Sequence, residues 1–183
     1  GENYEVGTVD RTTLTAEYAA KFKYSDVFFF VDQQWDGNDD DSTYFELAPR
    51  LSLGETTGQN LSFGPVKDVL IATTWEHNAG HGANTEFNNF LYGIGFALDI
   101  PNTQYVNVNF YKADNDLTED DYQMTINYAV PFKIGSEEFL ADAFLDWSTA
   151  EDDHASELNW TTQYKWNAGK HISPNTRLYV GIE

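Results

Sequence analysis

Apolar side chains alternate with polar or small ones along residues 89–100. Successive side chains of an extended strand point to opposite faces, so this alternation predicts a β-strand with two unlike sides. One face carries Phe90, Tyr92, Ile94, Phe96, Leu98 and Ile100. The other face carries Asn89, Leu91, Gly93, Gly95, Ala97 and Asp99. A fold built from such strands has to offer a different environment on each side.

The same period recurs in about ten segments along the chain. The predicted strands cover residues 12–24, 27–35, 44–53, 66–76, 89–100, 105–111, 122–132, 139–147, 157–166 and 176–182. In the second strand Phe28, Phe29 and Phe30 are consecutive, and the parity of the strand places Phe29 and Val31 on the outward, apolar face. Pro49 lacks an N–H group, so we expect a bulge or a locally unpaired position in the third strand.

Strand length favours a barrel that crosses a membrane. Strands of about nine to thirteen residues match what a tilted strand needs to cross about 25 to 30 Å of hydrocarbon. The mean hydropathy of -0.51 does not exclude this, because only alternate residues of a barrel strand meet lipid. We predict an all-β fold, an antiparallel up-and-down transmembrane β-barrel with about ten visible strands, formed by residues 1–183 as a single domain.

A soluble β-sandwich or a lipocalin-like barrel alternates too, and it stays open as an alternative. Against it, the face opposite the apolar set carries too many charged and amide side chains for a packed interior. The chain has no cysteine, which excludes disulfides, thiolate metal sites and a cysteine nucleophile.

The connections between the predicted strands differ in charge at the two ends of the barrel. One end receives the acidic loops, with Asp36, Asp39, Asp40, Asp41, Asp114, Asp116, Glu119, Asp120, Asp121, Glu151, Asp152 and Asp153. The opposite end receives Lys67, Lys133, Lys170 and His171. Trp35, Trp75 and Trp147 lie near the acidic end of their strands, where we expect an interfacial aromatic belt.

The formal net charge is -20, from 30 acidic and 10 basic side chains. This charge argues against nucleic acid as a partner, because its phosphates would be repelled. It remains compatible with a lipopolysaccharide surface that divalent cations bridge to the protein.

Two neighbouring motifs carry a resemblance to a known family, and a third supports it. They are Phe45-Glu46-Leu47-Ala48-Pro49-Arg50-Leu51-Ser52-Leu53, Leu61-Ser62-Phe63-Gly64-Pro65-Val66-Lys67-Asp68 and Asn127-Tyr128-Ala129-Val130-Pro131-Phe132. The chain resembles the Tsx-type nucleoside-specific channels of Gram-negative outer membranes, including their OmpK-like members. The resemblance implies a monomeric twelve-stranded barrel in the bacterial outer membrane, with a narrow lumen that admits nucleosides. Some members of the family serve as phage receptors, so a phage is an implied partner.

The chain departs from that pattern at both ends. The family would have one strand before Thr12 and another after Glu183, and the loop count likewise puts both termini at the acidic end. We therefore expect that the first and last strands of the family are missing from this chain. Unpaired strand edges are costly in lipid, so closure of the barrel is an open question at this stage.

The inward face of the predicted barrel has the composition of a solute-selective lumen, with aromatic rings for a base and polar groups for hydroxyls. The predicted lumen residues are Phe28, Phe30, Asp32, Tyr44, Glu46, Arg50, Tyr105, Asn107, Asn109 and Tyr111. Glu46 and Arg50 lie four apart on one face, either as a structural ion pair or as solute contacts. Asn107 and Asn109 are either solute contacts or general lining of a wet lumen.

Other interpretations of the polar residues have weaker support in the sequence. Asp142 and Asp146 could form a pair of glycosidase carboxylates, but nothing else supports hydrolysis, and no enzyme activity is predicted. Residues 36–41 lack the glycine and terminal glutamate of an EF-hand, so we expect a solvated loop with adventitious divalent binding only. The four histidines have no zinc spacing, so neither a metal site nor a cofactor is predicted.

The sequence thus predicts an outer-membrane channel for passive diffusion of nucleosides or similar small polar solutes. Two alternatives stay open: a surface receptor, adhesion or structural barrel that acts through its acidic loops, and a soluble calcium-dependent binding sandwich. Detergent dependence of the protein would separate the last from the others.

Overall fold

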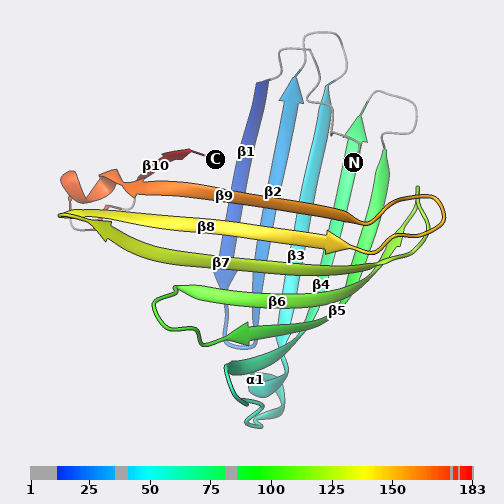
Figure 1. Cartoon of the computed structure of the whole chain (residues 1–183), viewed down its shortest axis with the longest axis horizontal. Coiled ribbons are helices and arrows are strands. Elements are labelled where there is room, and N and C mark those ends of the chain that lie inside the picture. Colours follow the sequence, from blue (N-terminus) through cyan, green and yellow to red (C-terminus); the bar gives the residue numbers. More distant parts are fainter. Residues whose placement is uncertain (1–11, 36–40, 81–85, 174, 177, 183) are drawn as a thin grey trace.

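A computed structural model describes residues 12–35, 41–80, 86–173, 175–176 and 178–182. Its strands form one antiparallel sheet of 10 strands, in which neighbours in the sheet are neighbours in the chain (Figure 1). The strands are β1 (Thr12–Lys21), β2 (Ser25–Trp35), β3 (Ser42–Ser52), β4 (Val66–Gly80), β5 (Phe87–Leu98), β6 (Tyr105–Asn115), β7 (Tyr122–Ile134), β8 (Glu137–Ser148), β9 (Glu157–Asn167) and β10 (Tyr179–Ile182). This up-and-down arrangement confirms the predicted all-β class.

The two faces of the sheet differ as the alternation predicts. On β5, Phe90, Tyr92 and Ile94 are 49%, 46% and 51% exposed, whereas Asn89 and Leu91 on the other face are 7% and 1% exposed. Apolar side chains therefore cover the outer face of the sheet, and they are not packed together as a dry core. This arrangement is typical of a membrane barrel and argues against the soluble sandwich.

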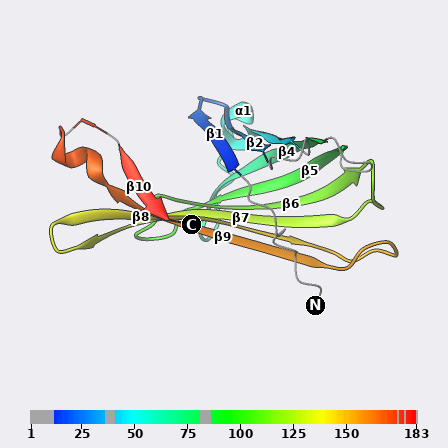
Figure 2. The same cartoon turned by 90° about the horizontal axis from the view of Figure 1, so that it is seen from above.

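The sheet is strongly curled, so that β1 to β5 and β6 to β9 run in different directions (Figures 1 and 2). The concave side is identified by a contact between strands that are not neighbours: Arg50 Nη1 of β3 lies 3.4 Å from Asn109 Oδ1 of β6. We call this side the inner face. β1 and β10 are the edge strands of the curled sheet that the structure describes.

Two inward glycines of β5 allow this curl. A Cβ atom at Gly93 would come within 1.8 Å of the carbonyl oxygen of Phe110, and one at Gly95 would meet Asn109 Oδ1 at 2.5 Å. Inward side chains of β4, β5 and β6 meet over the same region, in a buried cluster of Ala72, Leu91, Tyr111 and Ala113. At Gly93 and Gly95, the absence of a side chain lets the neighbouring strand approach this closely.

Several predicted boundaries shift. β1 ends at Lys21 instead of Tyr24, because the N–H of Phe22 donates to the Ser25 carbonyl at 2.8 Å in a tight turn. β4 continues to Gly80 and β6 to Asn115, so that Asp114 lies in a strand and not in a loop. These extensions lengthen the strands at the end where the acidic connections lie.

Pro49 leaves a gap in the ladder and no bulge. On the side of β4, the register passes from Leu47 opposite Trp75 to Arg50 opposite Ala72 without a shift. The carbonyl oxygen of Pro49 accepts a hydrogen bond from Thr73 Oγ1 at 3.0 Å. Of the two expectations for Pro49, the locally unpaired position is therefore the one that holds.

The described connections contain two short helices, α1 (Leu53–Thr57) and the 3-10 helix η1 (Ala168–His171). The strand periodicity did not predict α1. Ser52 caps it, because Ser52 Oγ accepts from the N–H of Glu55 at 3.0 Å and donates to Asp68 Oδ2 at 2.6 Å. Among the described residues, no helix has both the length and the apolar character needed to cross a membrane.

Candidate functional site

The inner face gathers the polar side chains of successive strands into one surface. The register places Asp32 opposite Tyr44, and Glu46 opposite both Phe30 and Glu76. Further along the sheet, it places Asn107 opposite Asn127. The ten predicted lumen residues therefore all lie on the inner face, as the strand parity implied. Phe29, in contrast, lies on the outer face opposite Tyr18 and Leu47.

An aromatic row crosses β2, β3 and β5 on the inner face. The ring centroids of Phe28 and Phe30 are 5.9 Å apart, and those of Phe30 and Tyr44 are 5.7 Å apart. Phe87 continues the row, with its centroid 6.4 Å from that of Tyr44. The rings are tilted against one another and do not stack. Sequence reasoning missed Phe87, although its odd position on β5 matches the inward parity of Asn89.

Arg50 is paired with Asp26 and not with Glu46. Its Nε and Nη2 donate to the two carboxylate oxygens of Asp26, each at 2.8 Å. The predicted alternative of a lumen ion pair between Glu46 and Arg50 is wrong. Residues four positions apart on a strand share one face, but two repeats of the pleat separate them. Asp26, in contrast, lies directly opposite Arg50 on the neighbouring strand. Arg50 is thereby held against the inner face, where it also reaches Asn109.

The inward residues of β6 are bound to other protein groups. Tyr105 donates its hydroxyl to Asp142 Oδ1 at 2.7 Å, and Asn107 Nδ2 donates to Asn127 Oδ1 at 2.8 Å. Asn109 and Tyr111 are only 3% and 5% exposed, which limits their contact with any solute. For these four positions the geometry favours structural lining over direct solute contact.

Asp142 and Asp146 do not form a catalytic carboxylate pair. Asp142 accepts from Lys165 Nζ at 2.9 Å in an ion pair, in addition to the bond from Tyr105. Asp146 accepts from Thr125 Oγ1 and from Gln123 Nε2. Each carboxylate is thus engaged separately by its neighbours on the inner face.

Two carboxylates, Glu46 on β3 and Glu76 on β4, lie opposite each other on the inner face. The sequence predicted only Glu46 as a lumen residue. Glu46 accepts from the Tyr44 hydroxyl at 2.7 Å. Glu76, which lies opposite Glu46, accepts from Asn89 Nδ2 at 2.9 Å. Glu76 and Asn89 were not predicted as lumen residues. The signal was present in the sequence, because both positions share the inward parity of their strands.

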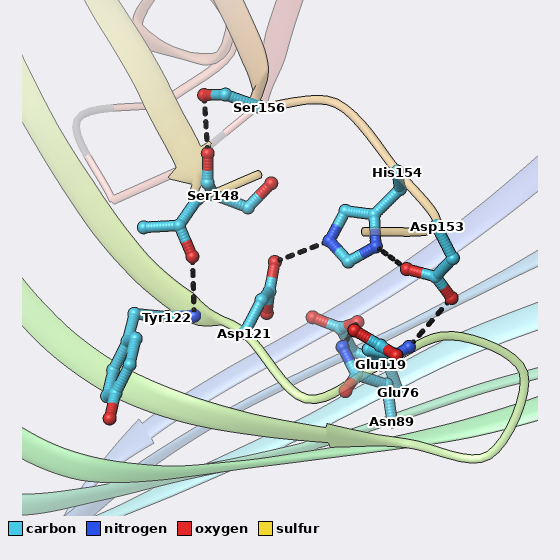
Figure 3. A network of polar contacts seen from close by, with 10 residues as sticks. Glu76, Asn89, Glu119, Asp121, Tyr122, Ser148, Asp153, His154 and Ser156 are labelled. Atoms are coloured by element: carbon cyan, nitrogen blue, oxygen red, sulfur yellow. Dashed lines mark hydrogen bonds and ion pairs between the residues drawn. The ribbon is translucent and has the colours of Figure 1, made fainter. Parts of the chain in front are cut away.

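The acidic connections after β6 and β8 contact each other at one end of the sheet (Figure 3). The N–H of Glu119 donates to Asp153 Oδ2 at 2.9 Å. His154 contacts two carboxylates. Its Nδ1 lies 2.5 Å from Asp153 Oδ1, and its Nε2 lies 3.4 Å from Asp121 Oδ2. Hydrogen bonds to Asp153 and then Asp121 raise the pKa of His154, and the bonds from Glu119 and His154 lower the pKa of Asp153. We call this contact the loop clasp.

A second acidic position lies beside the clasp. Asp116 accepts from the backbone N–H of Asn88 at 2.9 Å and from Asn88 Nδ2 at 3.0 Å, and these bonds lower the pKa of Asp116. Lys112 Nζ lies 2.8 Å from Asp120 Oδ2. The predicted clustering of acidic connections at one end is confirmed for the described residues. Asp36, Asp39 and Asp40, and with them the calcium reading of residues 36–41, lie outside the residues that the structure describes.

The opposite end carries the basic side chains that were predicted there. Glu137, at the start of β8, accepts from Trp166 Nε1 at 2.7 Å, and Lys170 Nζ lies 3.3 Å from its carboxylate. His171 Nε2 lies 3.0 Å from the same carboxylate. Lys133 pairs with Glu138 at 3.1 Å. The two ends of the sheet therefore differ in charge, as expected.

The tryptophans predicted for an interfacial belt lie on the outer face. Trp35, Trp75 and Trp147 are 41%, 37% and 41% exposed. Trp75 Nε1 donates to Asn88 Oδ1 at 3.1 Å, close to the acidic end. Their placement agrees with the belt, which stays a prediction. Within the described part of the chain, no group of three or more acidic, histidine or cysteine side chains is placed to hold a metal ion.

Comparison with known proteins identifies the family. A model of the family described as "Nucleoside-specific channel-forming protein, Tsx" matches residues 3–174. The outer membrane protein OmpK of Vibrio parahaemolyticus is 29% identical over 146 residues, which are 76% of this chain and 53% of that protein. The nucleoside-specific channel-forming protein Tsx of Escherichia coli O157:H7 is 26% identical over 170 residues, covering 81% of this chain and 58% of that protein.

The chain spans about half the length of these curated relatives. The motifs around Pro49 and Gly64 that suggested the resemblance both lie within the matched region. Gly64 has a positive φ of 51° in the tight turn between Phe63 and Val66, which explains the glycine in that motif. The chain belongs to the Tsx family of nucleoside-specific channel-forming proteins.

Proposed function

We propose that this chain forms part of the wall of an outer-membrane pore through which nucleosides diffuse passively. The observation that carries the proposal is the aromatic row on the inner face, with Phe28, Phe30, Tyr44 and Phe87 in sequence. A nucleobase stacks on an aromatic ring whatever its hydrogen-bonding pattern, which suits a channel that accepts several bases. Carboxylates border the row, since Asp32 and Glu46 lie on the same face.

A nucleoside has an apolar, flat base and a ribose with hydroxyl donors. The aromatic row offers faces to the base, and the free acceptor capacity of Asp32 and Glu46 offers partners to the hydroxyls. The acidic inner face disfavours nucleotides, because their phosphates would be repelled. The names of the curated relatives, which include nucleoside-specific channel-forming proteins, support the same solute class.

The outer face supports the proposed location in the bacterial outer membrane. Its exposed apolar side chains, such as Ile94 and Phe110, would contact lipid. The acidic connections would face the lipopolysaccharide side, where divalent cations can bridge carboxylates to anionic lipid. The name of the Vibrio relative, an outer membrane protein, supports this location.

Nucleoside flux into liposomes that contain the protein tests the proposal. We expect faster entry of adenosine and uridine than of an uncharged disaccharide of similar size. The variant Phe30→Ala is expected to reduce nucleoside entry about fivefold, since a lost base-stacking contact is worth about 1 to 3 kcal/mol. The matched control is Phe29→Ala, which removes the same ring from the outer face.

Equal reductions by both variants would assign the effect to folding and not to solute contact. Equal entry of nucleosides and disaccharide through the unmodified protein would overturn the proposed solute class. Absence of any solute entry would overturn the channel function itself.

A further inference from the structure

A hollow lies on the outer face of the sheet, where β3, β4 and β5 run side by side (Figure 1). Its volume is about 300 Å³, at the lower end of the range of small-molecule sites. We call this hollow the outer notch. Its outward lining residues are Leu47, Pro49, Thr73, Trp75, Phe90 and Tyr92.

The outer notch exists because small side chains cross the outer face between two rows of large ones. The unshifted register of β3 and β4 places Pro49 opposite Thr73, and neither side chain is large. The row toward the acidic end consists of Leu47, Trp75 and Phe90, and the row toward the basic end consists of Leu51, Ile71 and Ile94. The notch is therefore a gap in an otherwise continuous apolar surface.

The floor of the notch suits an apolar occupant. Pro49 has no N–H group, and its carbonyl oxygen accepts from Thr73 Oγ1 at 3.0 Å. This bond satisfies the carbonyl and uses the hydroxyl proton, so the pair does not depend on water for these two groups. The proline ring and the threonine methyl group remain to contact an occupant.

Trp75 forms a wall of the notch that its neighbours hold in place. Its ring stacks on Phe90, with centroids 5.9 Å apart and 12° between the planes, and Phe45 meets it edge-on at 4.9 Å. Its Nε1 donates to Asn88 Oδ1 at 3.1 Å. A wall that is already ordered loses little further freedom when a ligand binds.

The depth of the notch assigns it to the leaflet at the acidic end. His77 and Asn88 are bonded to each other on the outer face, and they lie four residues from Thr73 and Tyr92 along β4 and β5. At about 3.3 Å per residue and a tilt of about 40°, four residues correspond to a depth of about 10 Å. This depth is less than half of a hydrocarbon band of about 25 to 30 Å.

A lysine on the neighbouring strand indicates the same level. Lys112 lies opposite Tyr92 on β6, and its side chain is 41% exposed. Its Nζ lies 2.8 Å from Asp120 Oδ2 in the acidic connection. A lysine on a lipid-facing surface extends its ammonium group to the polar boundary, so this boundary lies close to the notch.

We propose that the outer notch seats one acyl chain of lipopolysaccharide and holds it longer than the surrounding chains. A chain elsewhere on the outer face touches protein on one side, whereas a chain in the notch touches its floor and walls and gains dispersion contacts. Lipopolysaccharide carries several chains on one headgroup, so its other chains can pack on the adjoining apolar rows once one is seated. The proposal rests on the outer-membrane location and on the proposed orientation of the acidic end, but not on the solute.

Native mass spectrometry of the protein released from detergent micelles that contain lipid A, the acylated part of lipopolysaccharide, tests the proposal. We expect a species with one bound lipid A molecule. The variant Thr73→Phe fills the notch with a ring, so the fraction of protein with bound lipid A should fall about threefold or more. Thr73→Leu fills less of the notch and should give an intermediate fraction, which keeps the test decisive if the phenylalanine variant does not fold.

Two control variants separate filling of the notch from other effects. Thr73→Val removes the hydroxyl that binds Pro49 but leaves the notch open. Val69→Phe adds a ring to the same face of β4, two repeats of the pleat away from Thr73. Both variants are expected to retain as much lipid A as the unmodified protein.

Unchanged retention of lipid A by both filled variants would overturn the notch as a lipid site, and so would an equal loss in Val69→Phe. Phosphatidylethanolamine with chains of the same length, added at the same concentration, is expected to be retained less often. Equal retention of the two lipids would overturn the assignment to lipopolysaccharide. Nucleoside entry through Thr73→Phe should equal that of the unmodified protein, so failure of the lipid site and failure of the channel are distinguishable.

Discussion

Asp26 and Arg50 face each other across β2 and β3 and share two hydrogen bonds of 2.8 Å. Their side chains are 25% and 13% exposed, so the pair is largely withdrawn from water. It neutralises the only arginine among the described residues, which would otherwise lie as a free positive charge beside Asn109.

Removal of the Asp26 charge is therefore expected to be costly. The variant Asp26→Asn should lower the free energy of unfolding by about 1 to 3 kcal/mol, because Arg50 keeps its charge but loses its ionised partner. Urea unfolding of the protein in phospholipid vesicles measures this change. Asp32→Asn is the comparison, since Asp32 accepts a hydrogen bond from the Thr15 hydroxyl and its loss should cost less. An equal loss in both variants would contradict a special role for the pair.

The opposite orientation of two adjacent phenylalanines predicts opposite responses to charge. Phe29 lies on the outer face and Phe30 on the inner face. A lysine in contact with lipid costs about 2 to 4 kcal/mol near the bilayer midplane, whereas one in an aqueous lumen is tolerated. Phe29→Lys should therefore reduce the yield of folded protein in vesicles far more than Phe30→Lys. The reverse order would show that the two faces have been assigned the wrong way round.

The curl of the sheet depends unequally on the two glycines of β5. An added Cβ at Gly93 would collide with backbone, namely the Phe110 carbonyl, whereas one at Gly95 would meet the movable side chain of Asn109. We expect Gly93→Ala to lower the free energy of unfolding by more than about 2 kcal/mol, as for other overpacked sites. Gly95→Ala should cost less. The same unfolding measurement ranks the two variants, and a larger loss at Gly95 would refute this account of the curl.

The loop clasp should depend on pH in both directions. The pKa of His154 is raised by Asp153 and Asp121, so its contribution is complete below the ordinary histidine pKa and is lost as the pH rises through the raised value. The pKa of Asp153 is lowered, so its contribution is complete above the ordinary aspartate pKa and is lost as the pH falls through the lowered value. The clasp is thus expected to be tightest between these two ranges, at about pH 5 to 6.

Hydrogen exchange at the Glu119 amide reports on the clasp, because this N–H donates to Asp153. Its protection factor, corrected for intrinsic exchange, should be highest at about pH 5 to 6 and should fall on both sides. In His154→Gln the fall toward high pH should disappear, while the fall toward low pH stays. A protection factor that changes with pH equally in the variant would exclude His154 as the cause.

The parity of the strands was sufficient to predict the sheet and the faces of its residues. Phe29 and Phe30 illustrate this, since their assignment followed from counting alone, even in a run of three identical residues. In a membrane barrel, lipid on one side and water on the other impose this alternation on each strand. The family motif near Gly64 adds a turn that requires a positive φ.

Partners within a face could not be predicted in the same way. Glu46 and Arg50 share one face of β3, and an ion pair between them was one of two alternatives. The ion pair of Arg50 is with Asp26, because cross-strand register and not spacing along one strand decides which groups meet. The register also brings Glu76 opposite Glu46, which alternation in a single strand does not reveal. The helix α1 was missed because its N-cap residue, Ser52, is also the last residue of β3.

The order of the strands bears on how the wall is assembled. Each strand pairs with the one made just before it, so every new hairpin closes only a short stretch of chain. Such local pairing lowers the entropic barrier of each step and allows growth from any hairpin, without threading a late segment between two earlier ones. The growing sheet can therefore lengthen by one strand at a time. The apolar face of each added strand can enter lipid while its backbone N–H and C=O groups form hydrogen bonds with the preceding strand.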